Sequence, residues 1–282
     1  MMQAALPAKA AARNPHLPFG KWGLRVSALT YLIVMIAIPI IVINIEGLRG
    51  GLDQFFADFT RPAALSALWL SIWTAAVMAV INIIMGTLTA YVLIHYRFPG
   101  KRLLDSMIDL PFAIPTLVTG IMLVLLYGPQ TAVSGFLDRQ LGIRILFAPP
   151  GIILALLFLG YPLVIRSVQP VLARLDTNQE EAAYTLGASG WLTFRRVVLP
   201  VIFPAMLTGG LLSFARALGE FGSIVIVSGN IPMRSQTAAV YIFGQVEAGN
   251  MGAASSVSVV LLLVSLVVTL GVDFAYRRKT YA

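Results

Sequence analysis

Residues 66–94 read SALWLSIWTAAVMAVINIIMGTLTAYVLI, without one charged side chain and without proline. The hydrocarbon core of a bilayer is about 30 Å thick, and a helix of about 20 apolar residues crosses it. Inside lipid, a helix satisfies its backbone N–H and C=O groups within itself. The stretch therefore predicts a transmembrane helix.

Five further apolar runs flank this one, and they cover residues 27–45, 106–128, 148–170, 201–228 and 253–275. The chain of 282 residues is 58% hydrophobic and 11% charged, with a mean hydropathy of +0.86. That is more apolar surface than one water-soluble core can bury. We predict an all-α membrane protein with six transmembrane helices, in which a transmembrane domain at 27–275 lies between tails at 1–26 and 276–282.

Two of these runs carry features that the average composition hides. The first run is too long for a secretion signal, so we expect it to remain as a span. The third run contains Pro111 and Pro115, which are expected to bend its helix.

Cations gather in alternate connections between the runs. The richer segments hold Lys9, Arg13, Lys21 and Arg25, then Arg97, Lys101 and Arg102, then Arg174, Arg195 and Arg196, then Arg277, Arg278 and Lys279. The poorer segments hold Arg49 and Arg61, then Arg139 and Arg144, then Arg234. Because cytoplasmic loops carry an excess of Lys and Arg, both termini and the 171–199 loop are predicted to be cytoplasmic. The net charge of +8 then suits anionic lipid headgroups, and no nucleic-acid partner is expected.

The longest of these loops contains, at residues 176–200, the stretch DTNQEEAAYTLGASGWLTFRRVVLP. Asp176 and Thr177 are candidate N-caps, acidic residues follow in the first turn, and Gly187 stands where a helix must end or turn. We predict a short helix that docks in a cleft of another protein, with Trp191 and Phe194 holding the next segment to the bundle. The alternative is an amphipathic helix that rests on lipid headgroups.

This stretch resembles the EAA loop of binding-protein-dependent ABC importer permeases. The matching positions are Glu181, Ala182, Ala183, Gly187, Leu199 and Pro200, and Val197 stands where Ile is commoner. The resemblance implies the type I importer permease bundle. It also implies that the loop, with Glu180 beside the motif, is what a nucleotide-binding subunit grips.

A narrower resemblance extends over about residues 65–275. It is carried by residues 96–105, 109–116, 168–172, 213–222, 229–232 and 236–237, and it is to the T-type permease subunit of sulfate/thiosulfate importers. The resemblance implies a bacterial inner-membrane location, a homologous W-type permease, a dimer of ATPase subunits and a periplasmic or lipid-anchored sulfate-binding protein. Molybdate, tungstate and phosphate are the alternative cargoes.

The sequence holds no pattern for catalysis or for a metal site. A P-loop needs Gly-Lys followed by Ser or Thr, whereas Lys21 is followed by Trp22 and Lys101 by Arg102. ATP and Mg²⁺ would therefore be bound by a separate ATPase. There is no cysteine, and the two histidines, His16 and His95, are expected to face water or headgroups. An ion-coupled carrier would show inverted repeats and paired acidic residues at mid-membrane, and the sequence shows neither.

Two charged residues interrupt the fifth apolar run. Arg216 and Glu220 are four residues apart, which would place them on one face of a helix at mid-membrane. Charges at that depth are costly and should face the bundle interior. They can pair with each other, line a gate or anion path together with Ser213 and Ser223, or pair with the partner permease. Near the ends of the third and fourth runs, Asp109 and Arg166 are expected to pair or snorkel.

Overall fold

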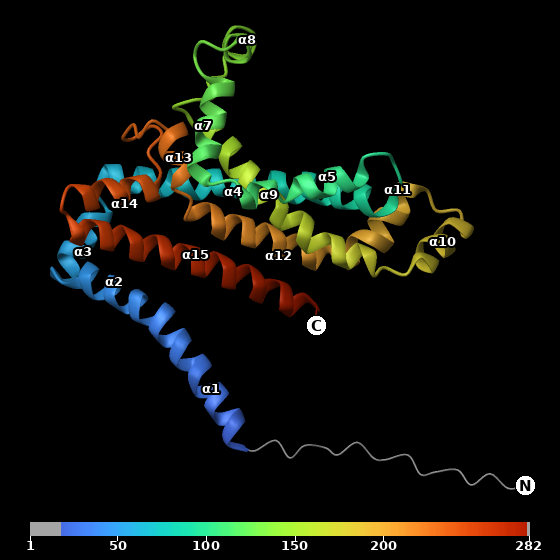
Figure 1. Cartoon of the computed structure of the whole chain (residues 1–282), viewed down its shortest axis with the longest axis horizontal. Coiled ribbons are helices and arrows are strands. Elements are labelled where there is room, and N and C mark those ends of the chain that lie inside the picture. Colours follow the sequence, from blue (N-terminus) through green and yellow to red (C-terminus); the bar gives the residue numbers. More distant parts are fainter. Residues whose placement is uncertain (1–17, 281–282) are drawn as a thin grey trace, which may run out of the picture. The chain divides into compact units, whose positions relative to one another are not determined.

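The computed structural model describes residues 18–280, and within that range it contains helices and no strand (Figure 1). Five helices are long and apolar enough to cross a membrane, and one bent pair brings the number to six. The all-α class is therefore confirmed for the described residues, and the five to six candidate spans agree with the six that were predicted. The chain divides into two compact units, the first ending at Ile45 and the second beginning at Glu46.

The first unit is built from one continuous helical run. α1 (Pro18–Leu32) passes through a π-helical turn (Ile33–Ala37) into α2 (Ile38–Leu48), so the helix begins before the predicted residue 27. Large apolar side chains along it are exposed, as lipid contact permits. Residues 1–17 of the predicted tail lie outside the described residues.

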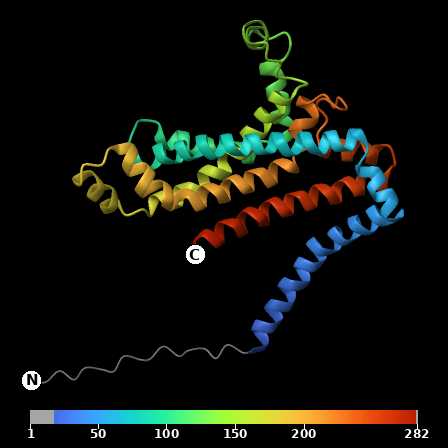
Figure 2. The same cartoon turned by 180° about the vertical axis from the view of Figure 1, so that it is seen from behind.

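Three long helices form the centre of the second unit. They are α4 (Pro62–His95), α9 (Pro149–Ala173) and α12 (Leu199–Leu218), and each packs against the other two. α3 (Gly51–Phe59) and α14 (Ala238–Glu247) pack against α15 (Met251–Thr280), and α15 runs alongside α12, as the reverse view also shows (Figure 2). α15 continues into the predicted tail at 276–282.

Gly160 lies where the three central helices meet. A Cβ atom on it would lie 2.6 Å from Ser213 Oγ, 2.7 Å from Asn82 Nδ2 and 3.0 Å from Met78 Sδ. Ser213 is fully buried and donates its hydroxyl to the Gly160 carbonyl at 2.6 Å. The absence of a side chain at this position therefore allows α9 to approach α4 and α12 closely.

Gly160→Val is expected to lower the free energy of unfolding by about 1–3 kcal/mol, because the added methyl groups overpack a site with no free space. Thermal unfolding of the purified chain in detergent measures this. Gly244→Val in α14 is the matched control, since nothing lies within 4 Å of a Cβ at Gly244. Equal loss of stability in the two variants would contradict close packing at Gly160.

The third predicted span, 106–128, is not one straight helix. The structure has α5 (Lys101–Ile108), α6 (Leu110–Ala113) and α7 (Thr116–Tyr127), and the chain turns by 110° between the α5–α6 pair and α7. Ile114 is extended, as a residue before proline prefers to be, and Pro115 cannot continue the hydrogen-bond ladder. The expected bend is thus a break. α8 (Ala132–Leu141) follows α7.

The boundaries predicted for the fifth span, 201–228, are wrong at both ends. The helix begins earlier, with α11 (Gly190–Thr193) and a π-helical turn (Phe194–Val198) that leads into α12. It ends at Leu218, and a separate α13 (Gly222–Val227) follows. The predicted 171–199 loop is shorter in consequence, because α9 runs to Ala173 and the helical run that leads into α12 begins at Gly190. Hydropathy alone could not locate these limits, because the helix begins before the charged Arg195 and Arg196, whereas apolar residues continue past its end at Leu218 into α13.

Candidate functional site

A short helix, α10 (Thr177–Thr185), occupies the connection between α9 and α11. The Asp176 carboxylate accepts a hydrogen bond from Asn178 N at 3.0 Å, which confirms Asp176 as the N-cap. At the other end, Gly187 N–H donates to Tyr184 O and Ala188 N–H donates to Ala183 O, the two bonds of a Schellman motif. Gly187 has a φ of +81°, a left-handed conformation that glycine adopts without strain. The predicted helix and its stop are therefore present.

The two faces of α10 differ. Glu181 and Ala182 are exposed, Ala183 is half-buried, and Leu186 just beyond the helix is 88% exposed. Glu180 is only 8% exposed and turns away from that face. The exposed face of α10 thus contains the first residues of the motif and excludes Glu180. Leu199 and Pro200, the last residues of the motif, lie in a different helix, at the start of α12.

The partner of Glu180 is His95, the last residue of α4. His95 Nε2 lies 3.1 Å from Glu180 Oε1, and the imidazole stacks on Tyr91 with ring centroids 4.1 Å apart. The expectation that His95 faces water or headgroups is wrong, because its side chain is 21% exposed. His16 lies outside the described residues. This contact ties α10 to the end of a central helix, and it joins residues 85 positions apart, for which the sequence carries no local signal.

The aromatic residues after α10 have unequal roles. Phe194 packs edge-on against Tyr91 at 5.6 Å between ring centroids and joins the core cluster at this end of the bundle. Trp191 stacks on Phe194 but is 70% exposed. Phe194 therefore holds the segment to the bundle as predicted, whereas Trp191 covers it from outside.

His95→Ala is expected to loosen α10. The largely buried Glu180 carboxylate would lose its partner, which lowers the free energy needed to open the segment by about 1–3 kcal/mol. Local opening of the segment then becomes at least about fivefold more frequent. The initial rate of tryptic cleavage after Arg174, an exposed residue beside α10, measures this opening. His95→Gln retains a donor and should cleave at nearly the wild-type rate; equal rates for the Ala variant and wild type would show that the contact does not hold α10.

The second predicted group of residues surrounds a break in the fifth span. Arg216 Nη1 lies 2.8 Å from Glu220 Oε2, and Glu220 Oε1 accepts hydrogen bonds from Ser223 N and Ser223 Oγ, both at 3.0 Å. The Glu220 side chain is 3% exposed and that of Arg216 is 46% exposed. Ser213, Arg216 and Glu220 also border one narrow crevice, which is too small to admit water.

The expectation that this pair lies on one helical face in the middle of the span is wrong. Arg216 is in the last turn of α12, and Glu220 follows the terminal Gly219. Glu220 thus closes the end of α12 through Arg216 and caps the start of α13 through Ser223. The pairing of Arg216 with Glu220 is observed, and a role in an anion path stays a prediction.

A further ion-pair cluster joins α5 to α9. Arg166 donates to Asp109 from Nε at 2.8 Å and from Nη2 at 2.6 Å, and to Asp105 Oδ1 from Nη1 at 2.8 Å. Asp109 and Arg166, each expected to pair or to snorkel, pair with one another, and the bidentate geometry is the strong form of this contact. It fixes the segment that leads into the 110° turn.

Comparisons with known proteins place this arrangement in a family. Residues 82–281 match the sequence profile described as "Binding-protein-dependent transport system inner membrane component". The chain belongs to this family. It is thus a multi-pass transmembrane permease subunit of the inner membrane, from an ABC transporter. Membership of this family implies that the chain works with a partner permease, an ATPase and a binding protein.

Curated relatives of this inner membrane component cover most of the chain. The "Probable sulfate transport system permease protein cysT" of Chlorokybus atmophyticus is 41% identical over 250 residues, which are 87% of this chain and 86% of the relative. The "Sulfate transport system permease protein CysT" of Synechocystis is 40% identical over 245 residues, which are 87% of this chain and 85% of the relative.

Solved structures share the fold. One chain of a bacterial alginate ABC transporter, in complex with an alginate pentasaccharide-bound periplasmic protein, aligns with a TM-score of 0.77 at 18% identity, over 93% of this chain and 95% of the other. One chain of an amino acid ABC transporter, whose structure was determined with histidines, aligns with a TM-score of 0.53 at 19% identity, over 77% of this chain and 94% of the other. At these low identities, the similarity shows only that the folds are alike.

Proposed function

We propose that this chain is the permease subunit through which an ATP-driven importer passes sulfate and thiosulfate. The observation that carries the proposal is α10, a rigidly capped helix whose exposed face holds Glu181 and Ala182. Similarity to sulfate permeases over 87% of the chain supports the cargo.

The assembly would contain a homologous W-type permease, two ATPase subunits that bind ATP and Mg²⁺, and a periplasmic or lipid-anchored sulfate-binding protein. The positive-inside pattern supports cytoplasmic termini and a cytoplasmic α10. Closure of the ATPase dimer would then push α10. The push would reach the central helices through the covalent connections to α9 and α11 and through the contact of Glu180 with His95 at the end of α4.

Transport would proceed by alternating access, with the anion path near the end of α12. Ser213, Arg216, Glu220 and Ser223 are the residues that we assign to this path or its gate. A dianion is repelled by an unpaired carboxylate, and the site suits an anion path because the Arg216 guanidinium neutralises Glu220 while Ser223 donates to it. Loading by the binding protein would supply most of the selectivity.

Uptake of labelled sulfate by cells that lack this gene tests the proposed cargo. We expect uptake to be lost, to return with the wild-type gene, and to be competed by thiosulfate in wild-type cells. Normal sulfate uptake with loss of molybdate, tungstate or phosphate uptake would refute sulfate as the cargo and leave the permease class intact.

A further inference from the structure

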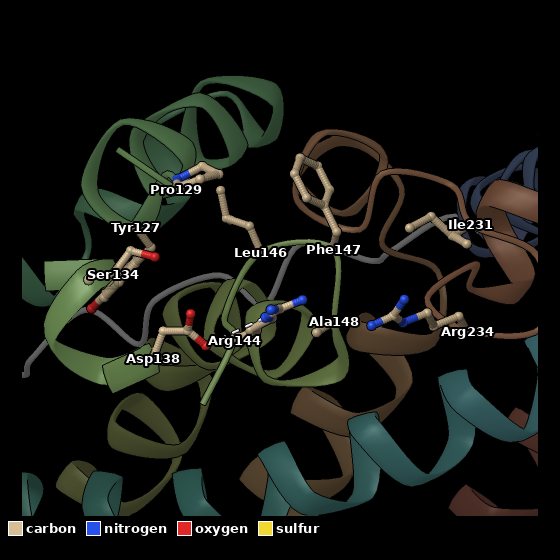
Figure 3. Close-up of a pocket in the computed structure, with 11 residues that line it drawn as sticks. Tyr127, Pro129, Ser134, Asp138, Arg144, Leu146, Phe147, Ala148, Ile231 and Arg234 are labelled. Atoms are coloured by element: carbon tan, nitrogen blue, oxygen red, sulfur yellow. Dashed lines mark ion pairs between the residues drawn. The ribbon is translucent and has the colours of Figure 1, made fainter. Parts of the chain in front are cut away.

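A cavity of about 350 Å³ opens between the α7–α8 region and the loop that joins α13 to α14 (Figure 3). A water molecule occupies about 30 Å³ in the liquid, so the space equals about a dozen waters. α8 and α13 lie away from α10 in both views of the chain (Figures 1 and 2). In the proposed orientation, this cavity is on the side from which the cargo arrives.

Two guanidinium groups point toward one another across the cavity. Figure 3 shows Arg144 and Arg234 on either side of Ala148. Arg144 Nε lies 3.5 Å from Asp138 Oδ1, a loose and exposed contact. Among the side chains that the structure describes, no carboxylate lies within ion-pair distance of Arg234. The hydroxyl-bearing residues Tyr127 and Ser134 complete a donor-rich lining with one excess positive charge.

The backbone around the cavity is strained. Phe147, Asn230 and Met233, with φ of 60°, 51° and 61°, are the non-glycine residues in left-handed conformation within residues 18–280. All three lie in the two loops that border the cavity. Such residues persist where the surrounding structure over-determines them, and they cluster at functional sites.

Hydrogen bonds hold these two loops in place. Phe147 N–H donates to Val227 O at 2.9 Å and so ties the first loop to the end of α13, where the second loop begins. Within the second loop, the buried Ser235 donates its hydroxyl to Ser228 O at 2.5 Å. Gln236 Nε2 donates to Asn230 Oδ1 at 2.7 Å. The cavity is therefore bordered by loops that are fixed before any ligand arrives.

The second loop contains the sequence Gly229-Asn230-Ile231-Pro232. These residues are part of the resemblance to sulfate permeases, and they lie outside the EAA loop. Gly229 has a φ of +68°, and a Cβ atom on it would strike the Phe147 ring. Ile231 O accepts hydrogen bonds from three backbone N–H groups, those of Arg234, Ser235 and Gln236. The loop thereby positions Arg234 at the cavity.

We propose that this cavity is a low-affinity binding site for a tetrahedral dianion such as sulfate, held between Arg144 and Arg234. The inference deepens the proposed function, on which its biological role as an entry site rests. Arginine suits this ligand because its planar donors match pairs of anion oxygens. The affinity stays low because both arginines are exposed and because Asp138 competes for Arg144. Low affinity favours onward release.

Equilibrium dialysis of labelled sulfate against the purified full-length chain, in phosphatidylcholine nanodiscs at low salt, tests the site directly. Arg144→Gln and Arg234→Gln should each weaken binding at least about tenfold. Arg139→Gln is the matched control: it removes the same charge from α8, but its Nε donates to Gly135 O and it does not line the cavity. Asp138→Asn should tighten binding several-fold, a gain that misfolding cannot imitate.

Equal sulfate binding by the wild type and both cavity variants would overturn the proposal, and so would weaker binding in Asp138→Asn. A phosphate-bearing lipid headgroup offers the same chemistry as the free anion. If phosphatidylglycerol in the nanodiscs displaces all bound sulfate, the site belongs to lipid and the proposal fails. Loss of sulfate uptake in cells without the gene, together with arginine-independent binding, would refute this site alone and leave the proposed function standing.

Discussion

Gly187→Val is expected to reduce sulfate uptake to less than about a tenth of wild type while leaving membrane insertion unchanged. The φ of +81° at this position costs a residue with a side chain about 1–2 kcal/mol, and more when the side chain is β-branched. The Schellman bonds that end α10 would open, and the exposed face would lose its fixed position. Uptake per amount of membrane-inserted chain is the quantity to measure.

Gly187→Asn separates backbone geometry from bulk. Nothing lies within 4 Å of a Cβ at this position, so neither variant clashes inside the chain. Asn tolerates the left-handed region far better than Val and should retain most of the uptake. Normal uptake by the Val variant would remove the coupling role from α10, and equal loss in both variants would point to crowding of a partner.

Arg216→Gln is expected to produce the largest loss of stability. It leaves the Glu220 carboxylate, 3% exposed, with Ser223 as its remaining partner. Removal of one partner of a buried pair costs about 3–5 kcal/mol, and we expect the lower end because Arg216 itself reaches solvent. Native proteins are stable by about 5–15 kcal/mol, so the yield of folded chain should fall severely. Size-exclusion yield and thermal unfolding in detergent report this.

The double variant Arg216→Gln with Glu220→Gln provides the control. It removes the buried charge, and the side-chain amide carbonyl that replaces the carboxylate can still accept from Ser223, so folding yield should recover. Arg195→Gln, an exposed change in the same span, should have little effect. Unchanged yield in Arg216→Gln alone would show that Glu220 is not held by this pair.

Hydropathy and capping chemistry predicted most of the architecture. The apolar runs located the spans because a helix must be apolar over about 20 residues to cross the hydrocarbon core of the bilayer. Asp176 and Gly187 located the ends of α10 because a cap and a left-handed stop are local requirements that specific residues satisfy.

The features that were missed depend on direction or on distant contacts. Pro115 suggested a bend, but composition does not record the 110° turn that it permits. Glu220 was read as a helix-face residue, although its carboxylate caps the next helix. The contact of His95 with Glu180 and the strained loops around Arg144 and Arg234 arise only when segments far apart in the chain meet.

We expect this chain to pass an oxyanion across the membrane when a separate subunit hydrolyses ATP. Proteoliposomes that contain the chain, a partner permease and the ATPase, with the binding protein on the opposite side from the ATPase, test it directly. We predict that labelled sulfate crosses from the binding-protein side only when ATP and Mg²⁺ are present on the ATPase side. Accumulation without ATP, driven by a proton or sodium gradient, would contradict the account.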